Sequence, residues 1–296
     1  MPQETINDGI FTSGLRPVTS LQHAKVRTEP IKWPNDARVA VTWTVIFELY
    51  SEVAPDPTWG YGIEDAKKAL YGGRRGVWRL LDQFDRHQMK ASFLINGYAA
   101  EKFPEAVVEI KKRGHEIVPY GYSSPRRLET MKLEQEKADI VKTLDILHKL
   151  TGAKPTGWVS PDQFPSNNTL DLLAAEGMTW NGDFPNDDLP YVVQAGGKSM
   201  VIIPFSRECD DYEIYGKNLE PPQVIADYFS DSLDVLYKEG ATFPKMMNAC
   251  IRCQYFGRPV GTKALDNALH YGKSLPHVWF ATRSEIADWW VKQNYS

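Results

Sequence analysis

The strongest constraint on the fold is a regular alternation of apolar, β-prone runs with amphipathic helical segments. The first run, residues 38–47 (RVAVTWTVIF), has the composition and length of a buried strand. Strands that alternate with helices pair in parallel, and the helices form the crossovers of a barrel. The pattern predicts further strands at 91–96, 116–118, 155–160, 200–203, 243–251 and 278–281, and helices at 76–87, 104–112, 132–150, 169–176, 222–239, 260–272 and 284–292.

The alternation fills most of the chain without an internal repeat or a composition break. We therefore predict that residues 35–296 form a single (β/α) barrel catalytic domain, a size that one barrel accommodates. Residues 1–34 are polar and are interrupted by prolines, so they predict an extended N-terminal arm.

The composition of the chain argues against several classes of binding partner. The net charge is −4 and the basic residues are dispersed, which argues against a nucleic-acid partner. No apolar run reaches the roughly 18 residues of a membrane span, and the N-terminus lacks the pattern of a secretory signal. The three cysteines include Cys250-x-x-Cys253, but no second pair completes a zinc site, so a structural or pocket-lining role is favoured. These features predict a cytoplasmic protein with no nucleic-acid partner and no membrane partner.

Two charged residues stand where barrel enzymes place their chemistry, at the carboxyl ends of strands. Glu48 follows the first apolar run, and a partly desolvated carboxylate there suits a general base. Arg252 follows the run at 243–251 and has the geometry to stabilise an oxyanion. A purely structural role is also open for each residue: a salt-bridged acid at the barrel rim for Glu48, and an ion pair with Glu48 or Asp162 for Arg252.

Short motifs along the chain occur in an order typical of one family. They lie at 75–81 (RGVWRLL), 92–97 (SFLING), 114–117 (GHEI), 169–174 (TLDLLA), 187–191 (DDLPY), 257–259 (GRP) and 278–283 (VWFATR). From about residue 36 to 292 the chain resembles the polysaccharide deacetylase superfamily, and within it the cytoplasmic branch of allantoinase-like and cyclic imide hydrolase-like enzymes. The resemblance implies a distorted (β/α) barrel and a homotetramer.

The departures from this family fall at its metal-binding positions. The segment that usually reads GHEIASHGYSHP reads GHEIVPYGYSSP here, so Tyr120 and Ser124 align with the two histidines. Leu49 aligns with the second of two acids at the end of the first strand, and a leucine cannot bind a divalent ion. Two further replacements are Val159, for the arginine of an R-x-P segment, and Arg252, for a late-strand histidine. The resemblance thus implies a site with no metal and no other cofactor.

The residues and the resemblance together predict a metal-independent hydrolase that opens a C–N bond in a small cyclic amide, imide or ureide. Glu48 is the predicted general base and Arg252 the predicted oxyanion-stabilising residue. Tyr120 and Ser124 are predicted to bind substrate, although they could instead simply fill the vacated metal space. A catalytically inactive small-molecule-binding homologue, a lactone hydrolase and a decarboxylase stay open, and a metal-dependent sugar deacetylase fits least. Further substrate-binding candidates are Asn96, Trp158, Asp162 and Cys250.

Overall fold

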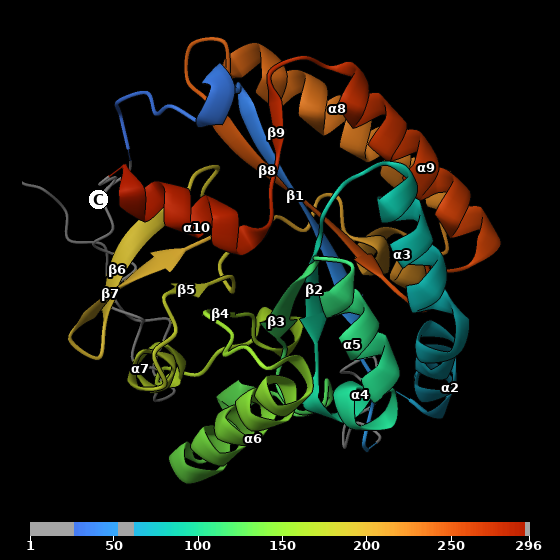
Figure 1. Ribbon diagram of the computed structural model, residues 1–296, viewed down its shortest axis with the longest axis vertical. Helices are drawn as coiled ribbons and strands as arrows, with labels where there is room; N and C mark the ends of the chain where they lie inside the picture. Colours follow the sequence, from blue (N-terminus) through green and yellow to red (C-terminus); the bar gives the residue numbers. More distant parts are fainter. Residues whose placement is uncertain (1–26, 53–61, 294–296) are drawn as a thin grey trace, which may run out of the picture.

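The computed structural model describes residues 27–52 and 62–293, which form an α/β fold with helices packed around mainly parallel strands (Figure 1). This confirms the fold class that the sequence predicts. The larger sheet has the order β3-β2-β1-β8, and β9 pairs with the beginning of β1. All of these pairs are parallel, and the strands are β1 (Val39–Phe47), β2 (Ser92–Ile95), β3 (Glu116–Pro119), β8 (Lys245–Arg252) and β9 (Val278–Phe280).

The central strand β1 is buried on both faces, as expected for a parallel sheet covered on both sides. Successive side chains of β1 point to opposite faces of the sheet, so odd-numbered and even-numbered residues lie in different surroundings. The odd-numbered residues, such as Trp43 and Phe47, join the hydrophobic core under the outer helices. The even-numbered ones, such as Thr44 and Ile46, face the interior between the two sheets. This two-residue period sets which later side chains reach the site.

The second sheet has the order β4-β5-β7-β6, and it corrects two expectations. The strand predicted at 155–160 is only two residues long, and β6 pairs with β7 in antiparallel orientation. The β6–β7 turn is Gly196-Gly197, both at positive φ, which suits a tight hairpin that glycine favours. The strands are β4 (Gly157–Trp158), β5 (Trp180–Asn181), β6 (Tyr191–Ala195) and β7 (Lys198–Ile202).

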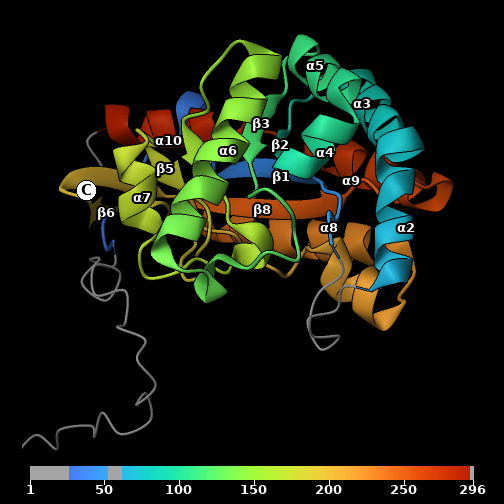
Figure 2. The ribbon, with the colours of Figure 1, turned by 90° about the horizontal axis from the view of Figure 1, so that it is seen from below.

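Backbone hydrogen bonds link both edges of the larger sheet to segments outside its strands, and the two sheets together take an open, barrel-like arrangement (Figure 2). On one side the Val159 N–H donates to the Pro119 carbonyl over 3.2 Å. On the other side the Cys250 N–H donates to the Cys209 carbonyl over 2.8 Å. Irregular segments rather than full strands therefore complete the circuit there.

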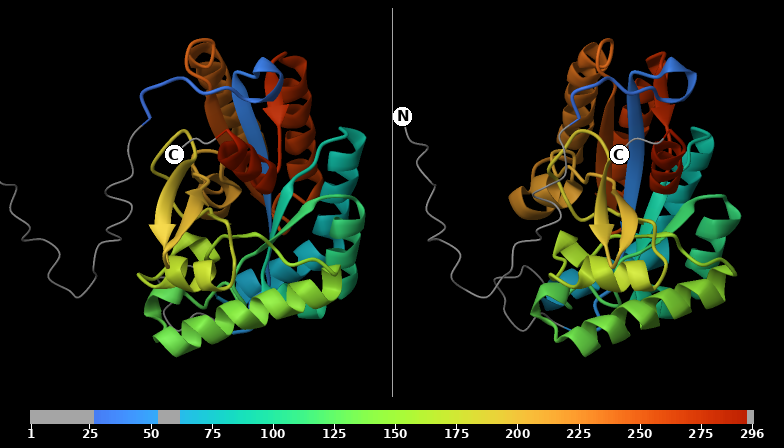
Figure 3. Two further views of the ribbon diagram at one scale, coloured as in Figure 1. Left: turned by 60° about the vertical axis from the view of Figure 1, so that its left-hand side comes forward. Right: turned by 90° about the vertical axis from the view of Figure 1, so that its left-hand side faces the viewer.

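Helices surround the strands, and α3, α8 and α9 pack against the larger sheet, while α6 runs along the opposite end of the molecule (Figure 3). Among the helices of residues 27–52 and 62–293, none has the length and apolar character needed to cross a membrane. The sequence prediction missed α2 and α4. The helices are α2 (Ile63–Tyr71), α3 (Val77–Arg86), α4 (Gly97–Lys102), α5 (Pro104–Lys112), α6 (Leu133–Thr151), α7 (Thr169–Ala175), α8 (Pro222–Glu239), α9 (Pro259–Ser274) and α10 (Arg283–Lys292), with short turns η1 (Pro34–Asp36), η3 (Gly72–Gly76), η4 (Leu128–Thr130), η5 (Pro161–Gln163) and η6 (Tyr212–Gly216).

The first residue of α10 extends into the barrel interior. Arg283 is fully buried, and its Nε donates to Thr44 Oγ1 over 3.1 Å while its Nη2 donates to Asn248 Oδ1 over 2.7 Å. Thr44 in turn donates to the same Asn248 oxygen. One guanidinium thus links the last helix to β1 and β8, and burial lowers the pKa of Arg283 to about 10.

The predicted N-terminal arm lies mostly outside the described residues, since 1–26 are not among them. The described end of this segment is packed against the barrel. Trp33 is buried, contacts Trp290 of α10 at 6.0 Å between ring centroids, and donates from Nε1 to the Lys245 carbonyl over 2.8 Å.

Candidate active site

Four of the predicted site residues come from one edge of the larger sheet. Phe47 pairs with Ile95, and Ile95 pairs with Pro119, so the next residues, Glu48, Asn96 and Tyr120, stand level across three strands. Arg252, the last residue of β8, is in register with Ile46 of β1. Because parallel strands end at a common edge, the structure brings these four residues to the same end of the sheet.

Glu48 continues the interior-facing, even-numbered series of β1 and is 1% exposed. The Ser124 hydroxyl donates to its Oε2. Its Oε1 accepts from Gln254 Nε2 over 3.0 Å and from the Tyr50 hydroxyl over 3.3 Å. Burial raises the pKa of Glu48 above its usual range, although the charge of Arg252 and the hydrogen bonds oppose this shift. A carboxyl group with a raised pKa in a hydrogen-bonded setting is suited to accept and return a proton.

Arg252 lies beside Glu48 and is held by two aspartates that the sequence pattern did not single out. Its Nε is 3.6 Å from Glu48 Oε1. Its Nη1 is 2.5 Å from Asp210 Oδ1 and 2.9 Å from Asp211 Oδ1, and its backbone N–H also donates to Asp211. The ion pair between Arg252 and Glu48 is thus present, whereas the carboxylates bound to Nη1 are Asp210 and Asp211.

These contacts determine the charge states around Arg252. Burial opposes the charge of the guanidinium, but attraction to Asp210 and Asp211 outweighs it and holds the pKa of Arg252 well above its usual range. Burial raises the pKa of Asp211 to about 7, against the opposing effect of Arg252. Within the described residues Nη2 of Arg252 makes no hydrogen bond, so this nitrogen can donate to a ligand.

Tyr120 and Ser124 occupy fixed places beside the carboxylate. The Tyr120 hydroxyl accepts from the Asp162 N–H over 2.8 Å, which leaves its own proton to be donated. Burial raises the pKa of Tyr120 well above its usual range, so the hydroxyl is protonated at neutral pH. Ser124 is fully buried, and besides donating to Glu48 it accepts from Asn96 Nδ2 over 3.4 Å. Ser124 therefore orients Glu48.

Asn96 and Asp162 have structural contacts that position the site. Asn96 caps α4 by accepting from the Ala99 N–H, and its amide exchanges hydrogen bonds with the backbone of Leu49. Asp162 has φ of 52°, in the left-handed region, and the charge of its carboxylate raises the pKa of Glu48. Direct substrate contact by either residue stays a prediction.

Trp158 and Cys250 are less accessible than predicted for ligand contacts. Trp158 is 0% exposed and packs in a core cluster with Leu173 and Ile202. Cys250 is also 0% exposed and faces the barrel interior two residues before Arg252, whereas Cys253 joins the outer core. The two thiols therefore lie on opposite faces of the strand and form no disulfide. Substrate binding by Trp158 or Cys250 stays a prediction.

Gln254 is a further site residue that the sequence pattern did not reveal. It is 1% exposed, and its Nε2 donates to Glu48. Its Oε1 is buried and has no hydrogen-bond partner. An unpaired buried carbonyl beside a candidate base can accept an N–H from a bound ring. The only sequence signal is its position two residues after Arg252.

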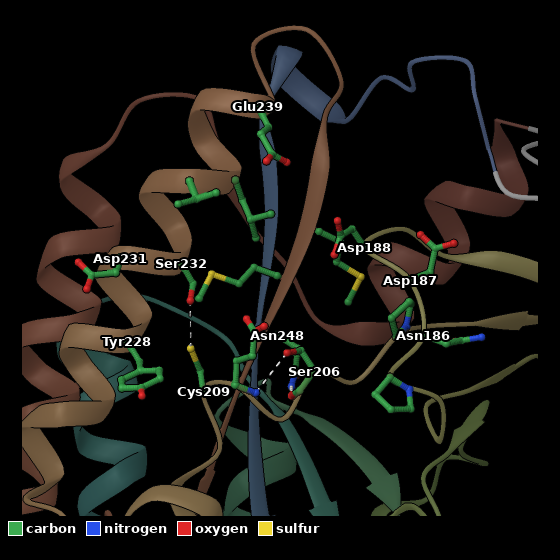
Figure 4. Close-up of a pocket in the computed structure, with 17 residues that line it drawn as sticks. Asn186, Asp187, Asp188, Ser206, Cys209, Tyr228, Asp231, Ser232, Glu239 and Asn248 are labelled. Atoms are coloured by element: carbon green, nitrogen blue, oxygen red, sulfur yellow. Dashed lines mark hydrogen bonds between the residues drawn. The ribbon is translucent and has the colours of Figure 1, made fainter.

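A cavity of about 1000 Å³ lies elsewhere, between α8 and the segment 185–188 (Figure 4). Its wall includes Asp187, Asp188 and Asn248 but none of the residues around Glu48. The DDLPY segment at 187–191 was expected to border the pocket or to form an exposed turn. Its two aspartates line this separate cavity.

The donor set around Glu48 does not fit a divalent cation. Within the described residues no group of three or more His, Cys, Asp or Glu side chains is arranged to hold a metal ion. Asp210 and Asp211 contact the Arg252 guanidinium, which lies 3.6 Å from Glu48 and already supplies positive charge there. Leu49 points into the outer core and is 2% exposed. A catalytic zinc site needs three protein ligands that converge on one point.

Comparison with known proteins identifies the family. The polysaccharide deacetylase family model matches residues 60–180. The "Putative polysaccharide deacetylase" of Schizosaccharomyces pombe is 28% identical over 93% of this chain and 96% of that protein. The crystal structure of a "probable Polysaccharide deacetylase" from Pseudomonas aeruginosa PAO1 is 30% identical, with a TM-score of 0.80 over 88% of this chain and 94% of that chain.

A second solved structure, that of Puue allantoinase, is 28% identical, with a TM-score of 0.82 over 91% of this chain and 96% of that chain. These similarities extend over both sheets and the surrounding helices rather than over one motif. The chain therefore belongs to the polysaccharide deacetylase family.

Proposed function

We propose that this protein hydrolyses a C–N bond in a small cyclic amide, imide or ureide without a catalytic metal. The observation that carries the proposal is the buried Glu48 carboxylate, with its raised pKa, beside an Arg252 guanidinium whose Nη2 is open to a ligand. Membership of a hydrolase family that acts on C–N bonds supports the reaction class, and the similarity to Puue allantoinase supports the preference for a cyclic substrate.

The proposed reaction uses one water molecule. Glu48 takes a proton from the water, and the resulting hydroxide forms a bond to the ring carbonyl carbon. The negative charge moves to the carbonyl oxygen, which accepts hydrogen bonds from Arg252 Nη2 and the Tyr120 hydroxyl. The C–N bond then breaks, and Glu48 returns its proton to the leaving nitrogen. The product carries a new carboxyl group at one end of the opened ring and an N–H at the other.

The hydrogen bonds to Glu48 support this double use of the carboxyl group. Ser124 and Gln254 hold its two oxygens in place, one on each side. The Gln254 carbonyl, buried and unpaired, is suited to accept the ring N–H of an imide or ureide. Arg252 Nη2 and the Tyr120 hydroxyl can donate to a ring carbonyl, and the Gln254 carbonyl can accept from the ring N–H. These three groups match the C=O and N–H of such a ring.

A direct test is a substrate screen run with and without a chelator. The panel contains cyclic imides, ureides, lactones and N-acetylated sugars. The proposal expects turnover of an imide or ureide that the chelator leaves unchanged. Chelator-sensitive release of acetate from a sugar would instead assign the activity named for the deacetylase relatives. Hydrolysis of lactones alone would indicate a lactone hydrolase, and binding without turnover of any compound would indicate an inactive small-molecule-binding homologue.

We also propose that the protein is a cytoplasmic homotetramer. The three cysteines are free thiols, which fits a reducing compartment. Large hydrophobic side chains are exposed on several helices, among them Ile63, Tyr228 and Val260, and they are available for subunit contacts. The small-molecule substrate is the only other partner proposed.

A further inference from the structure

The following inference rests on the proposed function and concerns the charge of the substrate. We propose that Asp210 and Asp211 are specificity-determining residues: by neutralising Arg252 they make the site accept uncharged rings and reject rings that carry a carboxylate.

Asp210 and Asp211 bind Arg252 Nη1, a nitrogen that would otherwise be available to an anionic ligand. Both contact Nη1, at 2.5 and 2.9 Å, and Nε is directed to Glu48 at 3.6 Å. A substrate carboxylate binds arginine best through two parallel hydrogen bonds from two nitrogens. Only Nη2 is left without a partner within the described residues, and a single donor suits a carbonyl oxygen.

The charges of the buried side chains around Arg252 also disfavour an anionic substrate. Glu48, Asp210 and Asp211 are each at most 3% exposed, and they surround one guanidinium. A second guanidinium on this side, that of Arg207, is already bound to the Asp162 carbonyl over 2.5 Å and lies 3.6 Å from Glu213. Three buried carboxyl groups against one committed cation disfavour a further anion.

The neighbouring aromatic side chains fit an uncharged ring. The Arg252 guanidinium lies 4.9 Å from the centroid of the Tyr212 ring, and the Tyr50 hydroxyl donates to Glu48. Burial raises the pKa of both Tyr212 and Tyr50, so these hydroxyls are protonated at neutral pH. They add polar contacts without adding positive charge.

Three ligands that share one ring test the proposal: 5,6-dihydrouracil, its 6-carboxylate and its 6-carboxamide. The carboxamide matches the carboxylate in size but has no charge. Binding is measured by calorimetry and hydrolysis by initial rates, both on the full chain at pH 7.5. We expect the carboxylate to bind at least roughly 100-fold more weakly than the carboxamide, because like charges in a desolvated site repel strongly.

Two variants assign the selectivity to its residues. Asp210→Asn and Asp211→Asn each remove one charge while keeping the size of the side chain, and each is expected to reduce the discrimination against the carboxylate by roughly 10-fold. Affinity for the carboxamide should change much less. Glu208→Gln is the matched control, since Glu208 lies in the same segment, is exposed and does not contact Arg252. It should leave the discrimination unchanged.

The outcomes separate this inference from the proposed function. Equal or tighter binding of the carboxylate by the wild-type chain overturns the inference, as does unchanged discrimination in both folded aspartate variants. If the rings bind in the expected order but none is opened, the inference stands and the hydrolase function fails. If rings are opened without regard to charge, the function stands and the inference fails. Binding of none of the three at millimolar concentration overturns both.

Discussion

At the scale of single residues, the proposed chemistry depends on one carboxyl group, that of Glu48. Glu48 is buried, so its charged form is disfavoured, yet it keeps hydrogen bonds that stabilise that form. These opposing effects are the setting in which one residue can both take and return a proton. The next three predictions test this group and its cationic neighbour.

Glu48→Gln should reduce turnover by roughly 10²-fold or more, the usual scale for removing a positioned general base. Glutamine keeps the size of the side chain and can still accept from Ser124, so folding should be preserved. The measurement is kcat on the substrate found by the screen, with circular dichroism as the check on folding. A correctly folded variant with near-wild-type turnover would remove Glu48 from the mechanism.

Arg252→Lys should lower kcat/KM by roughly 10-fold or more, because lysine keeps the charge but loses the planar array of donors. A single ammonium cannot contact Asp210 and Asp211, approach Glu48 and still present a free N–H to the substrate. Steady-state kinetics measure the effect. Unchanged kcat/KM would mean that Arg252 acts only as a structural charge.

The pH dependence of activity should show the raised pKa of Glu48. The base is active when ionised, so activity falls as the pH drops through the folded-state pKa of Glu48, which lies above its ordinary value of 4.5. The acidic limb of kcat/KM should therefore have its midpoint above pH 4.5. A profile of initial rates from acidic to mildly basic pH measures it. The residual activity of Glu48→Gln should lack this limb, and its persistence there would assign the limb to another group.

At the scale of elements, the two-residue period of β1 and β8 decides which side chains reach the site. It directs Glu48 and Arg252 inward, and it directs Leu49 and Cys253 into the outer core. The sequence predicted these strands and the residues at their carboxyl ends because burial periodicity is a local property. It could not predict Asp210, Asp211 or Gln254, which lie in irregular segments that only tertiary pairing brings to Arg252. The hairpin of β6 and β7 was missed for a similar reason, since its pairing overrides the parallel pattern.

The Leu49 side chain is directed into the outer core, and a further prediction follows from this direction. Leu49→Asp places an acid at the position where the family resemblance predicts a metal ligand, but the Leu49 side chain lies in a hydrophobic cluster. We expect no metal binding and a loss of several kcal/mol of unfolding free energy, the scale for a buried unpaired charge. Urea unfolding and elemental analysis measure the two effects, with Leu49→Met as control. Stoichiometric zinc in a stable Leu49→Asp protein would contradict this.

At the scale of the whole molecule, the family and the fold are established, whereas the assembly is a prediction. We expect a tetramer of the 33.6 kDa chain. Exposed apolar side chains such as Leu219 and Val260 would then be partly covered. Light scattering at micromolar concentration gives the mass directly. A mass that stays at that of one chain across the concentration range would rule out the tetramer.

The Arg283 side chain, which extends into the barrel interior, also affects the order in which the chain folds. The polar groups of Thr44 and Asn248 in the interior receive this guanidinium from the last helix. A ribosome delivers residue 283 only after both of the strands that it joins. Until then Thr44 Oγ1 lacks the Nε donor and Asn248 Oδ1 has only the Thr44 hydroxyl, so the interior can reach its final packing only after residue 283 has been made.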